Sequence, residues 1–199
     1  MPSPTVELSS GGLFCDKSIH VINAWGPTRN FRLTKGRDYI MTAWVKVVSG
    51  KAWMSGDLRH KEKSTDTWPT SNLVYESMNC QHSETGPTGG KWVLMKMKIP
   101  ASSILADKNW ETENWYARVF VGAINGGDVY INDIRFSPAK SHVSSIYYDM
   151  LSNQPVLTID ENNKHSQKVS FDGFGRPVKW EKINIALKPG DPGFATTVQ

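Results

Sequence analysis

Aromatic and arginine side chains are the residues of this chain whose chemistry stands out. The 199 residues include eight tryptophans, and aromatic residues make up 11% of the sequence. Flat aromatic faces pack against apolar surfaces such as the C–H-rich faces of pyranose rings, while amide, carboxylate and guanidinium groups bond hydroxyls in pairs. This combination of residues can recognise a sugar without transforming it.

Three tryptophans lie in or beside polar stretches of the sequence. They occur in "SGKAWMSGD", "STDTWPTSN" and "DKNWETEN", and are Trp53, Trp68 and Trp110. An aromatic side chain in such a segment costs free energy through exposure unless it packs or binds. We therefore take these three as candidate sugar-binding residues, with ordinary packing as the alternative.

Other tryptophans lie in segments with strand character. Trp44, Trp92 and Trp115 are expected mainly in the core, but Trp44 alternates onto the same strand face as Thr42 and Lys46 and is kept as a binding candidate.

The segment "WYARVFVGA" places a cation among aromatic residues. Its period-two pattern puts Tyr116, Arg118 and Phe120 on one face, opposite an apolar face. A mixed face of this kind suits sugar binding, and Tyr116 and Arg118 are further candidates. The alternative is that Arg118 is an ordinary surface cation.

No catalytic motif is present in the sequence. It lacks H-E-x-x-H, G-x-S-x-G, P-loop and Rossmann glycine patterns, and its five histidines are dispersed. The expected strand interiors carry few carboxylates, chiefly Glu76 and Asp133, which is little for acid–base chemistry. The sequence therefore predicts that the protein is not an enzyme.

Charge and cysteine content exclude several other classes. The net charge of +4 comes from basic residues interleaved with acids, so we expect no nucleic-acid partner.

No run approaches the roughly 18 apolar residues of a membrane helix, and "MPSPTVELSSGG" is no signal peptide, so a targeting signal is expected outside this chain. Cys15 and Cys80 are either one disulfide or two buried thiols.

The elements that must position these residues are strands. "RDYIMTAWVKVVSG" alternates with period two, with Met41, Ala43, Val45 and Val47 on one face and Ile40, Thr42, Trp44 and Lys46 on the other, and "KWVLMKMKIP" repeats the design. "KAWMSGDL", "WYARVFVGA" and "GGDVYINDIRFSP" add further strands, and helical periodicity is nearly absent. These signals predict an all-β fold, an antiparallel two-sheet sandwich over residues 4–138.

The pattern of strands and turns expected from the sequence changes after "FSPAK". Residues 139–185 contain short strand pairs separated by the turns "LSNQP", "DENNK" and "DGFGRP", in which Asp149 and Asp172 are expected as turn residues. We expect a small β-hairpin appendage here. The proline- and glycine-rich residues 186–199 are expected to be a linker or tail.

Within that appendage, "SIYYDMLSNQPVLTID" and "KVSFDGFGRPVKW" resemble the tyrosine-aspartate (YD, or RHS) repeats of large bacterial surface and secreted proteins. Phe171 stands where the repeat has tyrosine. The resemblance covers about forty residues and implies a scaffold or link, without chemistry of its own.

The segments "YIMTAWVKV", "WVLMKMKIP", "WYARVFVGA" and "DVYINDIRFSP" together resemble the jelly-roll (galactose-binding-like) carbohydrate-binding modules over about 120 residues. The resemblance implies a jelly-roll sandwich and a structural calcium held by Asp133, with Asn132 and with Glu7 or Asp16 completing the shell. Asn132 departs from the paired aspartates common in that family. The alternative is that Asp133 pairs with Arg135 or caps a turn.

Together these interpretations predict a non-catalytic carbohydrate-binding module of a larger extracellular bacterial protein, with a glycan or polysaccharide as partner. A structural or adhesive spacer that caps a YD-repeat array and contacts protein is the alternative, and a jelly-roll glycosidase or lyase is the third.

Overall fold

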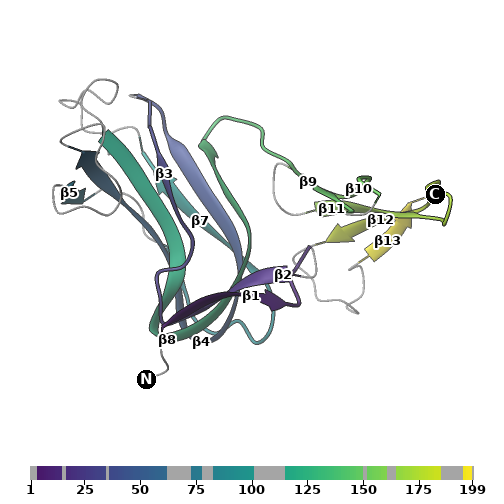
Figure 1. Ribbon diagram of the computed structural model, residues 1–199, viewed down its shortest axis with the longest axis horizontal. Helices are drawn as coiled ribbons and strands as arrows, with labels where there is room; N and C mark the ends of the chain where they lie inside the picture. The colour runs from purple at the N-terminus through teal and green to yellow at the C-terminus, as the bar shows by residue number, and fades with distance from the viewer. Residues whose placement is uncertain are drawn as a thin grey trace.

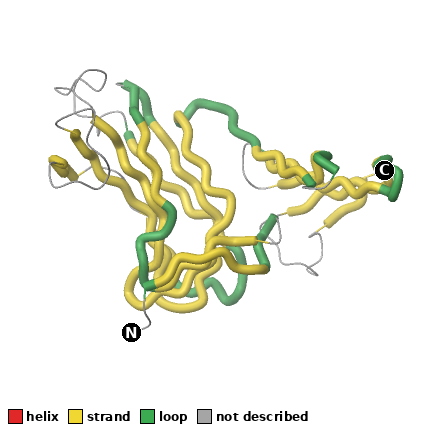
Figure 2. Tube along the Cα trace, in the orientation of Figure 1, coloured by secondary structure: helices red, strands yellow, loops and turns green. Residues whose placement is uncertain are grey.

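The computed structural model describes residues 4–14, 17–34, 36–61, 73–77, 83–100, 115–149, 152–160, 165–184 and 195–198. Within these ranges the chain forms strands and turns but no helix, and so no helix that could cross a membrane (Figure 2). Trp68, Trp110, Asp16 and both cysteines lie outside the described residues.

One large antiparallel sheet contains the first eight strands. They are β1 (Thr5–Ser10), β2 (Lys17–Ile22), β3 (Thr28–Phe31), β4 (Tyr39–Lys61), β5 (Leu73–Ser77), β6 (Ser83–Thr85), β7 (Val93–Ile99) and β8 (Trp115–Pro138).

Two of these strands, β4 and β8, are long and run through the whole sheet. Residues 39–49 of β4 pair with β7 and with residues 128–138 of β8, which in turn pair with β2. Residues 51–61 of β4 pair with β5, β6 and the first half of β8, and β3 pairs with that same half. The sheet thus has a β7 layer (β1, β2, β7 and residues 39–49 and 128–138) and a β3 layer (β3, β5, β6 and residues 51–61 and 115–124).

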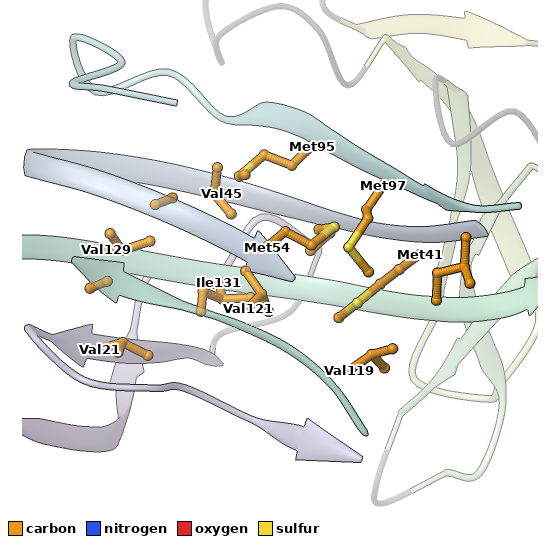
Figure 3. Packing of buried hydrophobic residues seen from close by; sticks show 14 of the residues in the cluster. Val21, Met41, Val45, Met54, Met95, Met97, Val119, Val121, Val129 and Ile131 are labelled. Atoms are coloured by element: carbon orange, nitrogen blue, oxygen red, sulfur yellow. The ribbon is translucent and has the colours of Figure 1, made fainter. Parts of the chain in front are cut away.

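The core lies between these two layers. Alternate residues of both halves of β4 and β8 join one buried cluster with β7 and β2, as Figure 3 shows for Met41, Met54, Met97, Val121 and Ile131. Residues from the two halves of one strand can share a core only if the sheet folds onto itself. The expected all-β antiparallel sandwich is therefore confirmed.

The bend that folds the sheet differs from the sequence expectation. Gly50 is the last residue of the expected strand segment "RDYIMTAWVKVVSG", but β4 continues through it with a φ of 62° and a shift of register, and β8 continues through Gly126. A Cβ on Gly50 would lie 2.5 Å from the Cα of Gly127, so the two bends meet where side chains cannot fit.

A second, five-stranded antiparallel sheet follows β8. It is a meander of β9 (Ser145–Tyr148), β10 (Pro155–Ile159), β11 (His165–Phe171), β12 (Pro177–Asn184) and β13 (Ala195–Val198), and it lies beside the sandwich (Figure 1). The expected hairpin is thus part of a larger sheet. Residues 195–198, within the expected linker or tail, pair with β12.

The turn roles of Asp149 and Asp172 are confirmed. Asp149 Oδ1 accepts hydrogen bonds from the backbone N–H and the hydroxyl of Ser152. Asp172 Oδ1 accepts from the backbone N–H of Phe174 and of Arg176, and Gly175 supplies a φ of 76°. These hydrogen bonds lower the pKa of the Asp172 carboxyl, and the bond from the backbone N–H of Arg176 has the largest effect.

Trp44 forms the junction between the sandwich and the second sheet. It is 3% exposed and packs in a cluster with Leu157 and Ile159, and its ring meets Phe14 edge-on at 6.4 Å. Trp44 does face away from the sandwich core, as its shared face with Lys46 indicated. The surface it faces is covered, so the expectation that it binds sugar is not supported by its position.

Candidate functional site

The outward surface of the β3 layer gathers aromatic and charged side chains. Along β8 the core takes Ala117, Val119 and Val121, so Arg118 and Phe120 point to the opposite side, as their contacts there show. The register pairs Asp57 with Arg118 and Trp53 with Gly122. We call this surface the aromatic face; its residues are Trp25, Arg32, Lys51, Trp53, Asp57, Glu84, Tyr116, Arg118 and Phe120.

Three rings form the apolar part of the aromatic face. Trp25 lies 4.6 Å from Phe120 and 5.7 Å from Trp53, measured between ring centroids, and the two indole planes are at 83°. Phe120 is 2% exposed beneath them, whereas Trp25 is 54% exposed. Burying Phe120 supports the two indoles in fixed orientations, so a large apolar ring surface remains in contact with solvent.

The position of Trp25 depends on a backbone crossing over β8. The N–H of Ala123 donates to the carbonyl of Ala24 at 2.9 Å, which brings residues 24–26 across the outer side of β8 at Gly122. A Cβ on Gly122 would lie 2.6 Å from that carbonyl oxygen and 3.1 Å from the Cα of Trp25. Only glycine at position 122 allows this approach.

Arg118 and Asp57 form the polar centre of the aromatic face. Asp57 Oδ2 accepts hydrogen bonds from Arg118 Nε at 3.0 Å and from Nη2. The Asp57 side chain is 3% exposed and that of Arg118 is 20% exposed, with its guanidinium carbon 5.3 Å from the centroid of Trp25. The acid and the indole together fix the guanidinium beside the rings, where its remaining N–H groups can meet hydroxyls.

Two further polar pairs flank this centre. Lys51 Nζ contacts Glu84 Oε2 at 2.9 Å. Two residues along β8 from Arg118, Tyr116 accepts a hydrogen bond from Arg32 Nη2 at 3.3 Å, and the guanidinium carbon of Arg32 lies 5.3 Å from the Tyr116 ring centroid.

The structure brings together three of the sequence-predicted candidates, Trp53, Tyr116 and Arg118. Sequence reasoning missed Trp25 and Asp57, which complete the arrangement. Trp25 lies in "NAWGPT", a segment with no periodicity, and no local pattern in the sequence places it beside Gly122, where the structure puts it. Asp57 lay in an expected strand, where the alternation from Trp53 places it on the same face.

The expected calcium ligands lie in other surroundings. Asp133 Oδ2 accepts from Arg135 Nε at 2.9 Å, and Oδ1 accepts from the hydroxyls of Ser145 at 2.9 Å and Tyr147 at 3.3 Å. The Asp133 side chain is buried and its φ is 44°. The alternative interpretation of Asp133, pairing with Arg135, is the arrangement observed.

Asn132 and Glu7 also have protein partners. The amide nitrogen of Asn132 donates to the Lys17 carbonyl at 3.0 Å, and Glu7 Oε1 lies 3.1 Å from His20 Nδ1. No group of three or more His, Cys, Asp or Glu side chains in the described part of the chain could hold a metal ion. As placed here these residues do not fit a calcium shell, and calcium stays an untested expectation.

His20 and its partners form a separate polar cluster on the outer side of the β7 layer. Its Nε2 lies 2.8 Å from Asp128 Oδ1, and its ring stacks on Tyr130 at 4.3 Å. Burial by itself would lower the pKa of His20, but hydrogen bonds and charges from Asp128 and Glu7 outweigh it and raise the pKa above 6.5.

Comparison with known proteins gives structural neighbours only. No protein-family model matches the sequence, and no curated protein matches it. The xylan-binding CBM22-1 domain of Paenibacillus barcinonensis Xyn10C is 12% identical with a TM-score of 0.43, over 71% of this chain and 85% of that one. A putative sugar-binding protein of Bacteroides thetaiotaomicron is 10% identical with a TM-score of 0.43, over 68% and 82%. A second xylan-binding CBM22 domain is 16% identical with a TM-score of 0.41, over 70% and 85%.

Proposed function

We propose that the aromatic face binds a glycan chain, at equilibrium and without turnover. The observation that carries the proposal is the placement of two supported indoles, Trp25 and Trp53, directly beside the Arg118–Asp57 pair on one exposed surface. Indoles stack on the apolar faces of sugar rings, and an oriented guanidinium donates to hydroxyl pairs.

Binding without catalysis is favoured by how the acids of the aromatic face are used. Asp57 accepts two hydrogen bonds from Arg118, and Glu84 pairs with Lys51. Acid–base cleavage of a glycosidic bond needs two carboxyl groups directed at the substrate, one of them able to give up a proton. Both described acids of this face are instead directed at cations of the protein.

The same proposal places the protein outside the cell as part of a larger bacterial protein, with the second sheet as the YD-like scaffold. Its support is the sequence resemblance of "SIYYDMLSNQPVLTID" and "KVSFDGFGRPVKW", together with the Asp-anchored turns that join β9 to β10 and β11 to β12.

A structural spacer is the second candidate function, because the second sheet exposes large apolar side chains. Ile146, Tyr148, Val178 and Trp180 are 36–59% exposed, and Phe174 is 86% exposed. A protein partner that covers such side chains would gain apolar burial.

Substituting the two indoles tests the glycan proposal against the spacer. We expect Trp25→Ala and Trp53→Ala each to weaken binding at least tenfold in calorimetric titration with the polysaccharide that binds best in a broad panel, because stacking is lost. Trp180→Ala removes a tryptophan from the second sheet and is the matched control, expected to bind like the wild type. Wild-type affinity in folded Trp25→Ala and Trp53→Ala proteins would contradict the proposal. No binding by the wild type to any polysaccharide in the panel, with the protein shown to be folded, would favour the spacer.

A further inference from the structure

Arg32 presents a guanidinium at one end of the aromatic face, next to Tyr116. Of the cations on this face whose side chains the structure describes, the other two are each held by an acid: Arg118 by Asp57 and Lys51 by Glu84. Among the described residues, Arg32 has the Tyr116 hydroxyl as its hydrogen-bond acceptor and contacts no carboxylate. The side chains of the aromatic face that the structure describes therefore keep one uncompensated positive charge, located at Arg32.

The contact with Tyr116 also orients this charge. The guanidinium donates through Nη2 to the hydroxyl, and its central carbon lies 5.3 Å from the ring centroid. One donor of five is used in this way, and the planar group is held near an aromatic ring. A planar guanidinium with further N–H groups available matches the two oxygens of a carboxylate.

Arg32 and the two indoles lie beside opposite ends of one segment of β8, residues 116–120. Phe120, which supports Trp25 and Trp53, is four residues from Tyr116 along β8, and this corresponds to roughly 13 Å. A short oligosaccharide bridges this distance. One sugar can therefore stack at the indoles while a substituent of the same chain reaches Arg32.

We infer that the glycan bound by the aromatic face carries a carboxylate on an occasional sugar, as in a polysaccharide with uronic-acid side groups, and that Arg32 binds this carboxylate. The inference rests on the proposed function. The carboxylate is occasional rather than present on every sugar, because Arg32 lies at one end of the face and the cations beside the indoles, Arg118 and Lys51, are already paired with acids.

The test uses a glucuronic-acid-substituted xylan, the same polymer with its carboxyl groups reduced to alcohols, and polygalacturonate, in which every sugar is charged. We expect the wild type to prefer the native xylan to the reduced one by about tenfold, the usual effect of one charge-assisted hydrogen-bonded pair. Arg32→Gln should bind both xylans equally, at the wild-type affinity for the reduced polymer. Polygalacturonate should bind more weakly than the native xylan.

Arg29→Gln is the matched control, since Arg29 lies in β3, three residues before Arg32, is exposed and pairs with Val119, a core residue on the opposite side of the layer. It should keep the full preference for the native xylan. Equal wild-type binding of the native and reduced xylans would overturn the role of Arg32 while leaving the proposed function intact. Tighter binding of polygalacturonate than of the native xylan would overturn the inference that only an occasional sugar carries a carboxylate. Failure of the wild type to bind any of the three, or any other glycan, would overturn the proposed function itself.

Discussion

Two charged or titratable side chains of this protein, Arg118 and His20, are each held in place by partners on two sides. Arg118 is held by Asp57 and by the Trp25 ring, and His20 is held between Asp128 and Glu7, one carboxylate at each ring nitrogen. A histidine with an acceptor at both nitrogens satisfies both only when both carry protons. The first arrangement orients a donor, and the second makes stability depend on pH.

The stability contributed by His20 should therefore decrease as pH rises. Since the folded-state pKa is raised above 6.5, the contribution is fully present below pH 6.5 and is lost as pH increases through the folded-state pKa. We expect His20→Gln to lower the free energy of unfolding by about 1 kcal/mol at pH 5.5, the usual net value of a hydrogen bond. The difference between variant and wild type should shrink by pH 8.5, measured by urea unfolding at each pH. A difference that is constant, or that grows with pH, would contradict this.

Some of the aromatic face could be predicted from the sequence because alternation is a local rule. Tyr116, Arg118 and Phe120 were placed on one face by spacing alone, and the structure confirms that placement. Trp25 could not be placed in this way, since its position depends on residues 24–26 crossing a strand about a hundred positions later in the chain. Alternation placed Trp44 on the strand face of Thr42 and Lys46, away from the sandwich core, but no local rule showed that the second sheet covers that face.

The loop that carries Trp25 depends on strand β8, and this dependence can be tested at one glycine. In Gly122→Ala the new methyl group would meet the Ala24 carbonyl oxygen at 2.6 Å, so residues 24–26 must move away. We expect a loss of stability of about 1–3 kcal/mol, as for other overpacked sites, and a loss of glycan affinity comparable to that of Trp25→Ala. Chemical denaturation and calorimetric titration measure the two effects.

Gly86→Ala provides the control for that substitution. Gly86 lies in the sandwich, has open space at its Cβ position and does not have the left-handed φ that would strain alanine. It should change neither stability nor affinity by more than about 0.5 kcal/mol. If Gly122→Ala behaves like Gly86→Ala, the crossing at Gly122 does not position the loop.

Strand positions were more predictable than strand ends. The alternating residues of 39–47 and 93–99 predicted which side chains are buried, with Val93 exposed where its strand begins. The continuation of β4 through Gly50 and of β8 through Gly126 was not predicted, because a glycine in a strand pattern signals either a stop or a bend. Only the partner strand decides between the two.

At the scale of the whole molecule, the described residues form two sheets joined by a buried polar contact and an apolar cluster. Asp133 receives donors from Arg135 in the sandwich and from Ser145 and Tyr147 in the second sheet, and Arg135 donates to the carbonyls of Val143 and Asp160. The Trp44 cluster adds apolar burial at the same junction. We therefore expect the hydrogen bonds of Asp133 to resist separation of the two sheets.

Asp133→Asn tests this coupling without straining the backbone, since asparagine tolerates the φ of 44° found at this position. The buried guanidinium of Arg135 would lose its acid, which typically costs about 3–5 kcal/mol. We expect amide hydrogen exchange in residues 145–149 and 152–159 to accelerate strongly, and exchange in residues 51–57 much less.

The exposed pair of Asp38 and Lys98 provides the comparison for Asp133. Lys98 Nζ lies 2.7 Å from Asp38 Oδ2 and both side chains are well exposed. Asp38→Asn should therefore lower the free energy of unfolding by no more than about 1 kcal/mol. Equal effects of the two substitutions on hydrogen exchange would show that Asp133 does not couple the sheets.

The passage of β4 through both layers gives the sandwich a mechanical property. Trp53 and Asp57 lie in one half of β4, and Trp44, at the junction with the second sheet, lies in the other. Tension between a ligand on the aromatic face and the second sheet would therefore act along this strand. The covalent backbone of β4 would carry that load directly, and its hydrogen bonds to β8 on both sides of Gly50 would resist straightening of the bend. The sandwich would then transmit a pulling force without its layers having to separate.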